Sequence, residues 1–370
     1  MTGDPTGDID NRSAGTGTMA GHGFYAEHSQ PQHAAAAMGL DLLAAAAGRV
    51  PLPDDRSPIV LADLGAAEGR NSRVPMGVAT DALRARTDAQ VMVVHTDLPG
   101  NDWGTFFEVL SADDPRGGVA EPAGHVFSFA AGRSFYDRVV PDDTLSIAWT
   151  SSTLHWLSRA PSAIDGHFFV QSSRDRGARE RYRAQSVRDW ERFLACRARE
   201  LREGGAVVFV DTLMGDDATM GAEALFDALQ ESIAAATGLG LVTDAAAGRL
   251  AYPAWFRTAG ELQSPFGAGV FTSPGGGELE LEVLEPQVLE DPFLAAYGTS
   301  GDADAYAAGQ VAFLQGFLEP SFRAQLAGTG SSHDALAHVW ADLHSRIVDD
   351  PVGLSPAWRM VAGTISRRRC

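Results

Sequence analysis

The sequence predicts an α/β fold, a Rossmann-like core that carries an inserted helical cap, and three observations support this. Short apolar runs rich in β-branched residues alternate with helical patterns between residues 57 and 214, which is typical of a mostly parallel sheet with helices on both faces. After Leu213 the pattern becomes helical. Strand-like segments then return near residue 277 and at the carboxyl end, so the helices interrupt the sheet rather than follow it.

The expected elements follow from these patterns. Four strands are expected in the first part of the chain, at residues 57–65, 91–99, 144–150 and 204–214, and two more at 277–286 and 357–368. The predicted boundaries are a disordered tail at 1–20, the Rossmann-like core at 21–212, the cap in two parts at 213–256 and 286–330, a continuation of the core at 257–285, and a final core helix and strand at 331–370.

Composition and charge exclude several classes of function. The chain has 370 residues, of which 45% are hydrophobic, and a formal net charge of −19, so no nucleic-acid partner is expected. Its two cysteines, Cys196 and Cys370, supply neither a disulfide framework nor a Cys-rich metal site, which fits a reducing cytoplasm. The amino-terminal segment lacks the features of a signal peptide, and no segment has the length and apolarity of a membrane span.

The loop "VLADLGAAEGRNS", residues 60–72, is the clearest chemical feature of the predicted core. A strand ends near Asp63 and Gly65, and a turn of small residues leads into a helix, an arrangement that opens backbone amides to a nucleotide-like ligand. The spacing differs from the G-x-G-x-x-G of dinucleotide enzymes, and a tight strand–helix connection also explains it. Asp97, at the end of the next strand, suits either the two hydroxyls of a ribose or a turn.

The stretch "TSSTLHWLS", residues 150–158, follows the third expected strand. His155 and Trp156 therefore lie near the carboxyl end of that strand, the edge at which open α/β sheets bind ligands. An isolated His-Trp pair is also typical of a hydrophobic core that contains a satisfied histidine. The pair by itself leaves both interpretations open.

Six segments in order resemble the SABATH family of S-adenosylmethionine-dependent carboxyl methyltransferases: "YAEHSQPQ", "DLGAAEGRNS", "TDLPGNDW", "GRSFYDRVVP", "SSTLHWLSRAP" and "FLACRARELREGG". Known members methylate small acids such as salicylate, benzoate, jasmonate and indole-acetate, and one branch methylates xanthine nitrogens. The resemblance runs from about Phe24 to the end and is strongest up to about Gly205. It implies a class I methyltransferase core, the cofactor S-adenosyl-L-methionine, a small carboxylic acid as the substrate, and a homodimer.

The resemblance also implies which residues form the site. The expected cofactor contacts are Tyr25 and Ser29 at the methionine end, Asp63 and Gly65 in the loop beneath, Asn71 near the carboxylate or amino group, Asp97 at the ribose, Leu98 at the adenine, and Ser134 and Phe135 over the purine. Gln32, His155 and Trp156 would grip the carboxylate that receives the methyl group. Several of these have plainer interpretations, since Leu98 and Phe135 suit a core and Ser29 and Asn71 suit a helix start.

The sequence departs from the family pattern at several positions. Ser152 stands where many plant members carry an aromatic residue of the substrate pocket, which predicts a differently shaped acid. His28 replaces the usual asparagine, and Ala66-Ala67-Glu68 replaces a small cysteine-serine pair of the cofactor loop. The stretch "GRLAYPAWF" lacks the Asp and Asn ligands through which some members hold magnesium, so no metal is expected.

The expected mechanism is positioning and desolvation, with no catalytic acid or base. A carboxylic acid of pKa about 4 to 5 is already ionised at neutral pH and needs no base. Neutral donors suit such an anion, namely the amide of Gln32, the indole N–H of Trp156 and an imidazole N–H of His155. Two alternatives remain: an N-methyltransferase or phenol O-methyltransferase acting on a small aromatic metabolite, and a non-catalytic S-adenosylmethionine-binding protein.

Overall fold

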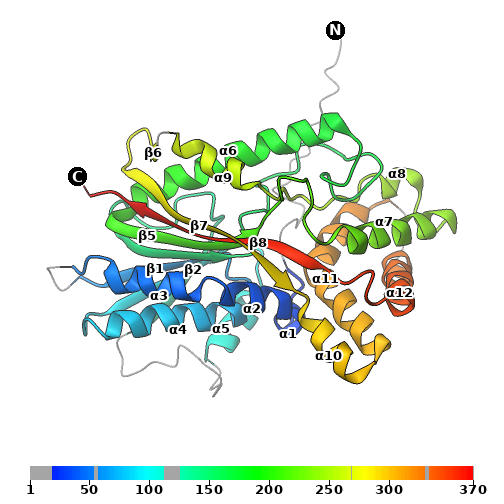
Figure 1. Cartoon of the computed structure of the whole chain (residues 1–370), viewed down its shortest axis with the longest axis horizontal. Helices are drawn as coiled ribbons and strands as arrows, with labels where there is room; N and C mark the ends of the chain where they lie inside the picture. The colour runs from blue at the N-terminus through cyan, green and yellow to red at the C-terminus, as the bar shows by residue number, and fades with distance from the viewer. Residues whose placement is uncertain (1–18, 54–56, 112–125, 268, 330–332, 370) are drawn as a thin grey trace, which may run out of the picture.

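A computed structural model describes residues 19–53, 57–111, 126–267, 269–329 and 333–369 of the chain. Of the tail predicted at residues 1–20, all but the last two residues lie outside the described part. The described residues fold around one mixed sheet (Figure 1). No helix in these ranges combines the length and the apolar character needed to cross a membrane.

The sheet of the described residues has eight strands in the order β3-β2-β1-β4-β5-β8-β7-β6. The parallel strands are β1 (Ile59–Leu64), β2 (Val91–Asp97), β3 (Val126–Gly132), β4 (Leu145–Ser151) and β5 (Leu201–Thr212). The antiparallel strands are β8 (Ala357–Arg367), β7 (Glu278–Glu290) and β6 (Val270–Thr272). The order reverses at β1, which pairs with β2 and β4, and such a switch point marks the ligand edge of an open sheet.

All six strands expected from the sequence are present, as β1, β2, β4, β5, β7 and β8. The sequence did not predict β3 and β6, which form the two edges of the sheet. β3 ends in Ala-Ala-Gly, residues with low strand propensity, and β6 has only three residues. Both strands depend on pairing with a longer neighbour, so their own sequences give little signal.

Helices cover both faces of the sheet (Figure 1). α3 (Leu40–Arg49) and α4 (Arg70–Arg84) pack together on one face, with α5 (Trp103–Ser111) beside α4. The long α6 (Arg176–Glu200) lies on the other face with the short α9 (Ala259–Gln263), which continues into the turn η1 (Ser264–Phe266). Because both faces are covered, β1 and β4 are buried almost throughout, as their apolar sequences indicate.

A second group of helices stands beyond the carboxyl ends of the parallel strands, on the right in Figure 1. We call this group the cap. Its members are α7 (Glu223–Gly238), α8 (Asp244–Ala247), α10 (Pro292–Ser300), α11 (Ala303–Leu326) and α12 (His333–Asp349). α12 packs against α7 and α11, and its Trp340 stacks on Phe322 of α11 with 6.3 Å between ring centroids.

Two expected boundaries differ from the structure. The sequence predicted that residues 331–370 belong to the core. In the structure α12, which lies in this segment, packs against α7 and α11 of the cap. Helical periodicity shows which residues are buried but not which neighbour buries them. The second part of the cap was expected from residue 286, but β7 runs to Glu290 and the first helix after it begins at Pro292.

Two short helices near the amino end, α1 (Phe24–His28) and α2 (Gln30–Ala37), connect the sheet to the cap. α1 contacts α11, and the backbone N–H of Ala20 donates to the carbonyl of Gly316 in α11 at 2.9 Å. α2 contacts α4, β4 and β5. This segment therefore brings the residues expected to bind ligands at the amino end, from Tyr25 to Gln32, to the edge of the sheet.

A buried ion pair at the end of α6 holds the loop that follows β3. Arg197 and Glu200 are fully buried, and Nε of Arg197 donates to Oε2 of Glu200 at 2.6 Å. The guanidinium also donates to the carbonyl oxygens of Phe135 at 2.9 Å and Asp137 at 2.8 Å. The carboxylate accepts from the backbone N–H of Val140 at 3.2 Å. The two charges therefore satisfy each other and the backbone of this loop.

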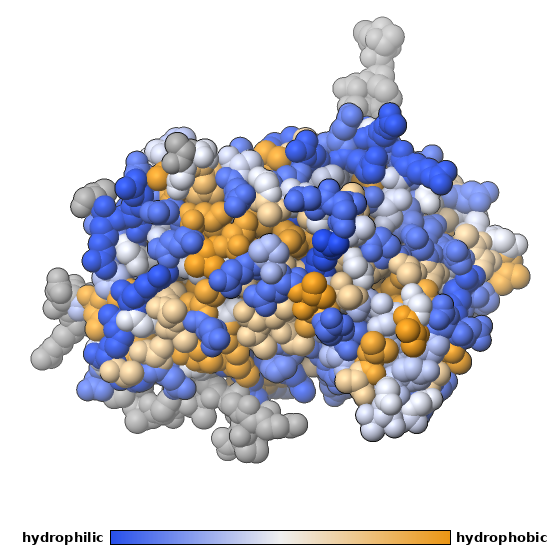
Figure 2. Space-filling model, viewed as in Figure 1, coloured by the Kyte–Doolittle hydropathy of each residue, from blue (hydrophilic) through white to orange (hydrophobic). Residues whose placement is uncertain are grey.

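The face of the molecule shown in Figure 2 is mostly hydrophilic, in keeping with the high net charge. Hydrophobic residues reach the surface of this face where Figure 1 shows β7 passing below α9. Phe271 of β6 and Leu281 and Leu284 of β7 are only partly buried against the core. The antiparallel end of the sheet is therefore covered less completely than the parallel half.

Replacing Arg197 by Met should lower the free energy of unfolding by about 3 to 5 kcal/mol, because the carboxylate of Glu200 would stay buried without its partner. Chemical denaturation followed by circular dichroism measures this change. Arg199→Met is the matched control, since Arg199 is partly exposed on the same helix and pairs with Asp142. That control should leave the unfolding midpoint nearly unchanged. An Arg197→Met protein as stable as the parent would contradict the role given to the pair.

Candidate active site

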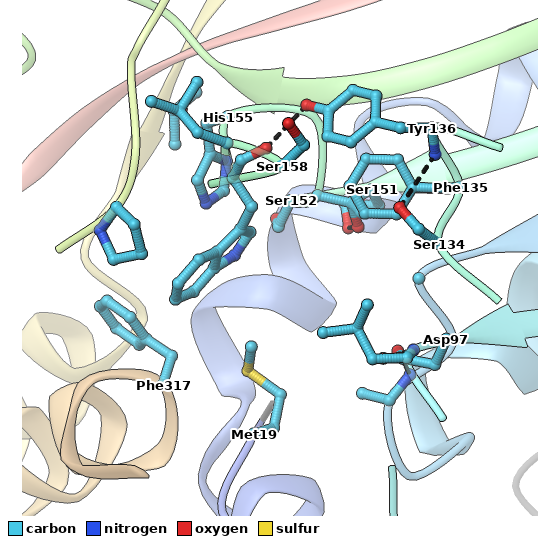
Figure 3. Close-up of a pocket in the computed structure, with 18 of the residues that line it drawn as sticks. Met19, Asp97, Ser134, Phe135, Tyr136, Ser151, Ser152, His155, Ser158 and Phe317 are labelled. Carbon is cyan, nitrogen blue, oxygen red and sulfur yellow. Dashed lines mark hydrogen bonds between the residues drawn. The ribbon is translucent and has the colours of Figure 1, made fainter. Parts of the chain in front are cut away.

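A large cavity lies between the carboxyl edge of the parallel strands and the cap (Figure 3). Its volume is about 1590 Å³, which exceeds the roughly 300–1,000 Å³ of a pocket for one small ligand. The lining comes from the loops after the parallel strands, from the amino-terminal helices, and from the cap together with β8. The cavity therefore has room for two small molecules at once.

The loop after β1 brings backbone to the surface of the cavity. Gly65 has a φ of +89°, and an added Cβ would lie 2.5 Å from Cγ2 of Thr153, so only glycine fits there. The N–H groups of Gly65 and Ala66 both donate to the carbonyl of Thr96 at 2.9 Å, which ties the loop to β2. The loop thus presents Gly65 and Ala67 to the cavity with no large side chain between them and a ligand.

Asp97, the last residue of β2, lies in the cavity wall beside this loop (Figure 3). Its Oδ2 accepts from the N–H of Ala67 at 2.8 Å, and its Oδ1 accepts from the N–H of Leu98 at 2.7 Å. Each oxygen keeps a second acceptor position. Burial raises the pKa of Asp97 to about 6, although the two backbone hydrogen bonds oppose the shift. Leu98, Ser134 and Phe135 also line the cavity.

A small pocket of about 30 Å³ opens beside the main cavity, and Tyr25 and Gln32 line both. Asn71 lines the small pocket, where its Nδ2 donates to Oγ of Ser29 at 3.1 Å. Oδ1 of Asn71 is buried and has no hydrogen-bond partner within the described part of the chain. A buried acceptor without a donor is costly, so this atom is suited to an amino group of a ligand.

Asp63 and Ser29 are more deeply placed than the other expected cofactor residues. Asp63 also lines the small pocket, but its carboxylate accepts hydrogen bonds from Oγ of Ser72 and from Nδ1 of His95, the latter at 3.2 Å. Ser29 is buried and donates to the carbonyl of Ala26 at 3.3 Å. Asp63 therefore stabilises the loop after β1 through these hydrogen bonds. Ser29 is connected to the small pocket through its hydrogen bond with Asn71.

The chemistry of these groups fits S-adenosylmethionine. Asp97 offers an acceptor on each oxygen, which suits the two neighbouring hydroxyls of a ribose. Asn71 offers an unpartnered acceptor, which suits the ammonium group of the methionine end. Gly65 allows a ligand to approach the backbone, and Phe135 supplies an apolar surface for a purine.

Gln32, Ser152, His155 and Trp156, the residues expected to hold the substrate, all line the main cavity. Oε1 of Gln32 is buried without a hydrogen-bond partner among the described residues. Ser152 has a φ of 54°, which is uncommon for a residue with a side chain, and its N–H donates to the carbonyl of Val210 at 2.8 Å. This bend after β4 leads the chain to His155 and Trp156.

His155 is paired with an aspartate that the sequence analysis did not identify. Nδ1 of His155 lies 2.6 Å from Oδ1 of Asp211, the second-to-last residue of β5, and both side chains are buried. A carboxylate oxygen only accepts, so the proton in this bond belongs to Nδ1. A neutral His155 then has no second N–H to offer a substrate. The donor role toward the acid that the resemblance implies for His155 then requires a proton on Nε2 as well.

Aromatic and other apolar side chains of the cap and of β8 form much of the remaining wall. They are Phe226, Tyr252, Phe256, Phe313, Phe317, Trp358 and Met360. Trp156 packs edge-on against Tyr252 with 4.8 Å between ring centroids. Tyr252 in turn contacts Phe317, with 5.5 Å between their ring centroids. The sequence does not show which residues form this wall, because its members come from separate segments that only the packing of the cap brings together.

The solvent-exposed end of the cavity carries arginine side chains from α6 and from the loop after β4. Arg159 and Arg188 both donate to Oε1 of Gln185, at 3.1 Å and 2.8 Å, and Arg192 forms an ion pair with Asp137. These positive charges lie in the cavity lining of a chain whose formal net charge is −19. An anion that enters the cavity therefore passes positively charged side chains, although the chain as a whole is negatively charged.

Glu68 joins the loop after β1 to the amino-terminal helix α1. Its carboxylate oxygens accept from the backbone N–H groups of Gly23 at 2.7 Å and Ala26 at 2.8 Å. α1 has no capping side chain of its own, so Glu68 satisfies N–H groups that its first turn would leave free. Glu68, one of the positions at which the sequence departs from the family pattern, thus anchors α1, the helix that carries Tyr25.

Within the described ranges, no group of three or more His, Cys, Asp or Glu side chains is placed to hold a metal ion. The stretch "GRLAYPAWF", residues 248–256, instead contributes Tyr252 and Phe256 to the cavity wall. The structure therefore shows aromatic side chains from the stretch in which the family pattern would supply magnesium ligands.

Sequence comparisons connect the chain to proteins of known activity. A family profile described as SAM dependent carboxyl methyltransferase matches residues 14–267. Gibberellic acid methyltransferase 2 of Arabidopsis thaliana is 30% identical over 203 residues, which are 50% of this chain and 51% of that protein. S-adenosyl-L-methionine:benzoic acid/salicylic acid carboxyl methyltransferase 3 of Petunia hybrida is 31% identical over 168 residues, 42% and 46% of the two chains. The matches thus span about half the length of these relatives.

The solved structure of loganic acid methyltransferase with SAH shares the fold. It aligns with a TM-score of 0.78 over 95% of this chain and 99% of that chain, at 16% sequence identity. The predicted class I methyltransferase fold with its inserted helices is thereby confirmed.

Replacing Asp97 by Ala should weaken binding of S-adenosylhomocysteine by roughly 1.5 to 3 kcal/mol, the scale of hydrogen bonds to a charged group. Calorimetric titration measures the affinity. Because the pKa of Asp97 is raised to about 6, the affinity of the parent should fall as the pH drops through 6 and the carboxyl takes up a proton. The variant should lack this dependence. Equal affinity in both proteins would remove Asp97 from the ribose site.

Replacing Gly65 by Ala should cost about 2 to 4 kcal/mol of stability, from the contact with Thr153 and the left-handed backbone. Thermal unfolding with and without S-adenosylhomocysteine measures both the stability and the loss of ligand protection. The control is Gly48→Ala in α3, where an added Cβ meets nothing within 4 Å and should be neutral or stabilising. A Gly65→Ala protein that melts and binds like the parent would show that the loop tolerates a side chain.

Proposed function

The chain belongs to the SAM-dependent carboxyl methyltransferase family, and we propose that it uses S-adenosyl-L-methionine to form the methyl ester of a small carboxylic acid. One observation carries the proposal: a single continuous cavity is lined both by Asp97 with the loop after β1 and by Gln32, His155 and Trp156. Two ligands held in one cavity react as if in a unimolecular step, and correct orientation alone supplies a large part of the rate.

The cofactor side of the cavity binds by hydrogen bonds and shape. S-adenosylmethionine supplies an activated methyl group on its sulfonium. Asp97 accepts from the ribose hydroxyls, and Asn71 accepts from the amino group. Leu98, Ser134 and Phe135 enclose the purine, and the buried ion pair of α6 keeps the backbone of Phe135 in place.

The substrate side orients a carboxylate and excludes water. The acid is ionised at neutral pH, since its ordinary pKa lies near 4 to 5, so transfer needs no general base. Gln32, Trp156 and His155 hold the carboxylate so that one oxygen faces the methyl group. The aromatic wall of the cap keeps water out, and removal of the hydration shell makes the carboxylate a better nucleophile.

The body of the acid is apolar. The cap and β8 line the cavity with Phe226, Phe313, Phe317 and Met360 among other apolar side chains, and such a surface offers hydrophobic contacts. Ser152 is smaller than the aromatic residue that the family resemblance implies at this position, which adds space. The relatives named for gibberellic acid and for benzoic and salicylic acids act on acids with ring systems, which supports an acid of this class.

A second candidate function has a specific observation in its favour. The pair of His155 with Asp211 has the geometry of a general base, and methylation of a phenol oxygen or a ring nitrogen requires either a base or an acceptor that is already ionised. The family match favours the carboxyl group as the acceptor, so we place this alternative second.

We also propose that the protein acts as a cytoplasmic homodimer. The family resemblance supports the dimer, and the small number of cysteines, with Cys196 free, supports a reducing compartment. Light scattering distinguishes a mass of 39.1 kDa from twice that value.

A panel of acids tests the proposed activity directly. The protein is incubated with S-adenosylmethionine that carries a deuterated methyl group and with benzoate, salicylate, indole-3-acetate, gibberellic acid or loganic acid. Mass spectrometry should detect a labelled methyl ester of at least one acid, cleaved by mild base. The Asp97→Ala protein serves as the control for cofactor-dependent transfer. Label on a phenol oxygen or a ring nitrogen would support the second candidate, and no transfer to any acid would contradict the proposal.

Replacing Trp156 by Phe should lower kcat/KM by about 1 to 3 kcal/mol of transition-state binding, because the indole N–H to the carboxylate is lost. Affinity for S-adenosylhomocysteine should stay nearly the same. Trp255→Phe is the matched control: Trp255 is equally buried, does not line the cavity, and donates its N–H to Glu261 at 3.0 Å. Unchanged rates in Trp156→Phe, or parallel losses of rate, cofactor affinity and stability, would assign Trp156 to the core.

A further inference from the structure

Asp211 is a buried carboxylate beside the substrate site that methyl transfer to an acid does not require. It is 4% exposed, it lies near the end of β5, and its Oδ1 is 2.6 Å from Nδ1 of His155. His155 is also 4% exposed and faces the cavity from the loop after β4 (Figure 3). An ionised acid needs no general base, so the pairing of Asp211 with His155 must serve a purpose other than base catalysis.

The pair determines which nitrogen of His155 meets the substrate. The proton shared with Asp211 is on Nδ1, so Nε2 is the nitrogen left for a ligand. In a neutral imidazole Nε2 carries a lone pair, which repels a carboxylate. In the imidazolium Nε2 carries a proton and donates a charge-assisted hydrogen bond. With its other proton on Nδ1, His155 therefore donates to an acid only in its charged form.

The tyrosines that face the pair remain neutral. Burial raises the pKa of Tyr252 well above its ordinary value, and the charge of Asp211 adds to the shift. Burial also raises the pKa of Tyr136, with Arg257 opposing the shift and Asp189 and Asp211 adding to it. Near neutral pH the ionised neighbours are therefore arginine and aspartate side chains.

The buried ionised neighbours supply no excess positive charge that could balance an incoming carboxylate. Arg257 is buried and donates to the carbonyl oxygens of Leu154 at 2.6 Å and Ser186 at 3.0 Å. Asp189 and Asp211 are buried carboxylates. Among these buried groups one is positive and two are negative, whereas Arg159 and Arg188 lie at the solvent-exposed end of the cavity, and an incoming carboxylate adds another negative charge. Uptake of one proton by His155 offsets it.

We propose that Asp211 is a positioning residue that holds the proton of His155 on Nδ1 and stabilises its imidazolium, so that the acid binds together with one proton. The inference rests on the proposed function, because it assigns a role within the binding of the carboxylic acid. Asp211 touches neither ligand and acts through His155. The pair thereby serves as a proton-coupled anion site rather than as a general base.

The protons and electrons of one turnover balance. The acid enters as a carboxylate, and a proton from solvent enters with it on Nε2 of His155. A carboxylate oxygen forms a bond to the methyl carbon as the bond from that carbon to sulfur breaks, and the electron pair of the broken bond stays on sulfur. The ester is neutral, so His155 loses its counter-charge and returns the proton to solvent as the ester leaves.

The test measures proton uptake when an acid binds. The probe is the acid of the panel with the highest kcat/KM, titrated into the complex with S-adenosylhomocysteine at pH 8 in two buffers of different ionisation enthalpy. The parent should take up about one proton per acid bound. Asp211→Asn keeps an oxygen for Nδ1–H but removes the charge. It should take up less than about half a proton and lose roughly 10- to 100-fold in kcat/KM at pH 8, with a smaller loss at pH 6.

Three controls separate this role from a structural one. Affinity for S-adenosylhomocysteine and the melting temperature report whether Asp211→Asn is folded. Asp291→Asn removes another buried aspartate, which is bonded to Tyr306, Gln310 and Ser355 and does not line the cavity, and should leave proton uptake unchanged. His155→Gln should abolish the uptake. If Asp211→Asn does not fold, the comparison of the parent with His155→Gln decides whether His155 takes up the proton.

The outcomes distinguish this inference from the proposed function. If the parent esterifies an acid without proton uptake, or if Asp211→Asn matches the parent in uptake and rate, the role of Asp211 is overturned and the function stands. If uptake is equal in the parent and in His155→Gln, the inference is overturned as well. If the parent methylates no acid of the panel, both are overturned.

Discussion

Five parallel strands end at the same edge of the sheet, and this geometry decides where the polar groups of the site lie. Gly65 follows β1, Asp97 ends β2, Ser134 follows β3, His155 follows β4, and Asp211 lies at the end of β5. None of these residues is near the next in sequence, and the sheet alone brings the first four to one cavity and places Asp211 against His155. The inserted helices then cover that edge, which explains why the cap supplies the apolar wall while the core supplies nearly all of the polar chemistry.

Two aspartates at this edge show how local environment sets a role. Asp97 meets only backbone N–H groups, and its burial raises its pKa, so its remaining acceptor positions suit uncharged hydroxyls. Asp211 is hydrogen-bonded to His155, so its carboxylate interacts with that side chain and not with a ligand. The same residue type therefore serves the cofactor at one strand end and acts through His155 at another. In a chain of net charge −19, an anionic substrate depends on such local arrangements and not on the overall field.

Much of the core could be predicted from the sequence, because buried parallel strands are continuous apolar runs and ligand residues follow them directly. Asp97, His155 and Trp156 were found in this way. Asp211 was missed because it stands inside the apolar run "VVFVDTLM" and its partner comes from the loop after another strand. The position of α12 and the walls formed by the cap depend on which helices pack together. Periodicity does not carry this information, and it likewise does not show that Glu68 would cap a helix more than forty residues earlier.

A structure of the protein with S-adenosylhomocysteine and the best acid of the panel would test the account most directly. The account predicts the ribose on Asp97, and the carboxylate of the acid within hydrogen-bond distance of Nε2 of His155 and Nε1 of Trp156, with the body of the acid against Phe317 and Tyr252. An acid bound with its carboxylate at the exposed arginines Arg159 and Arg188, and with its apolar body at His155, would contradict it.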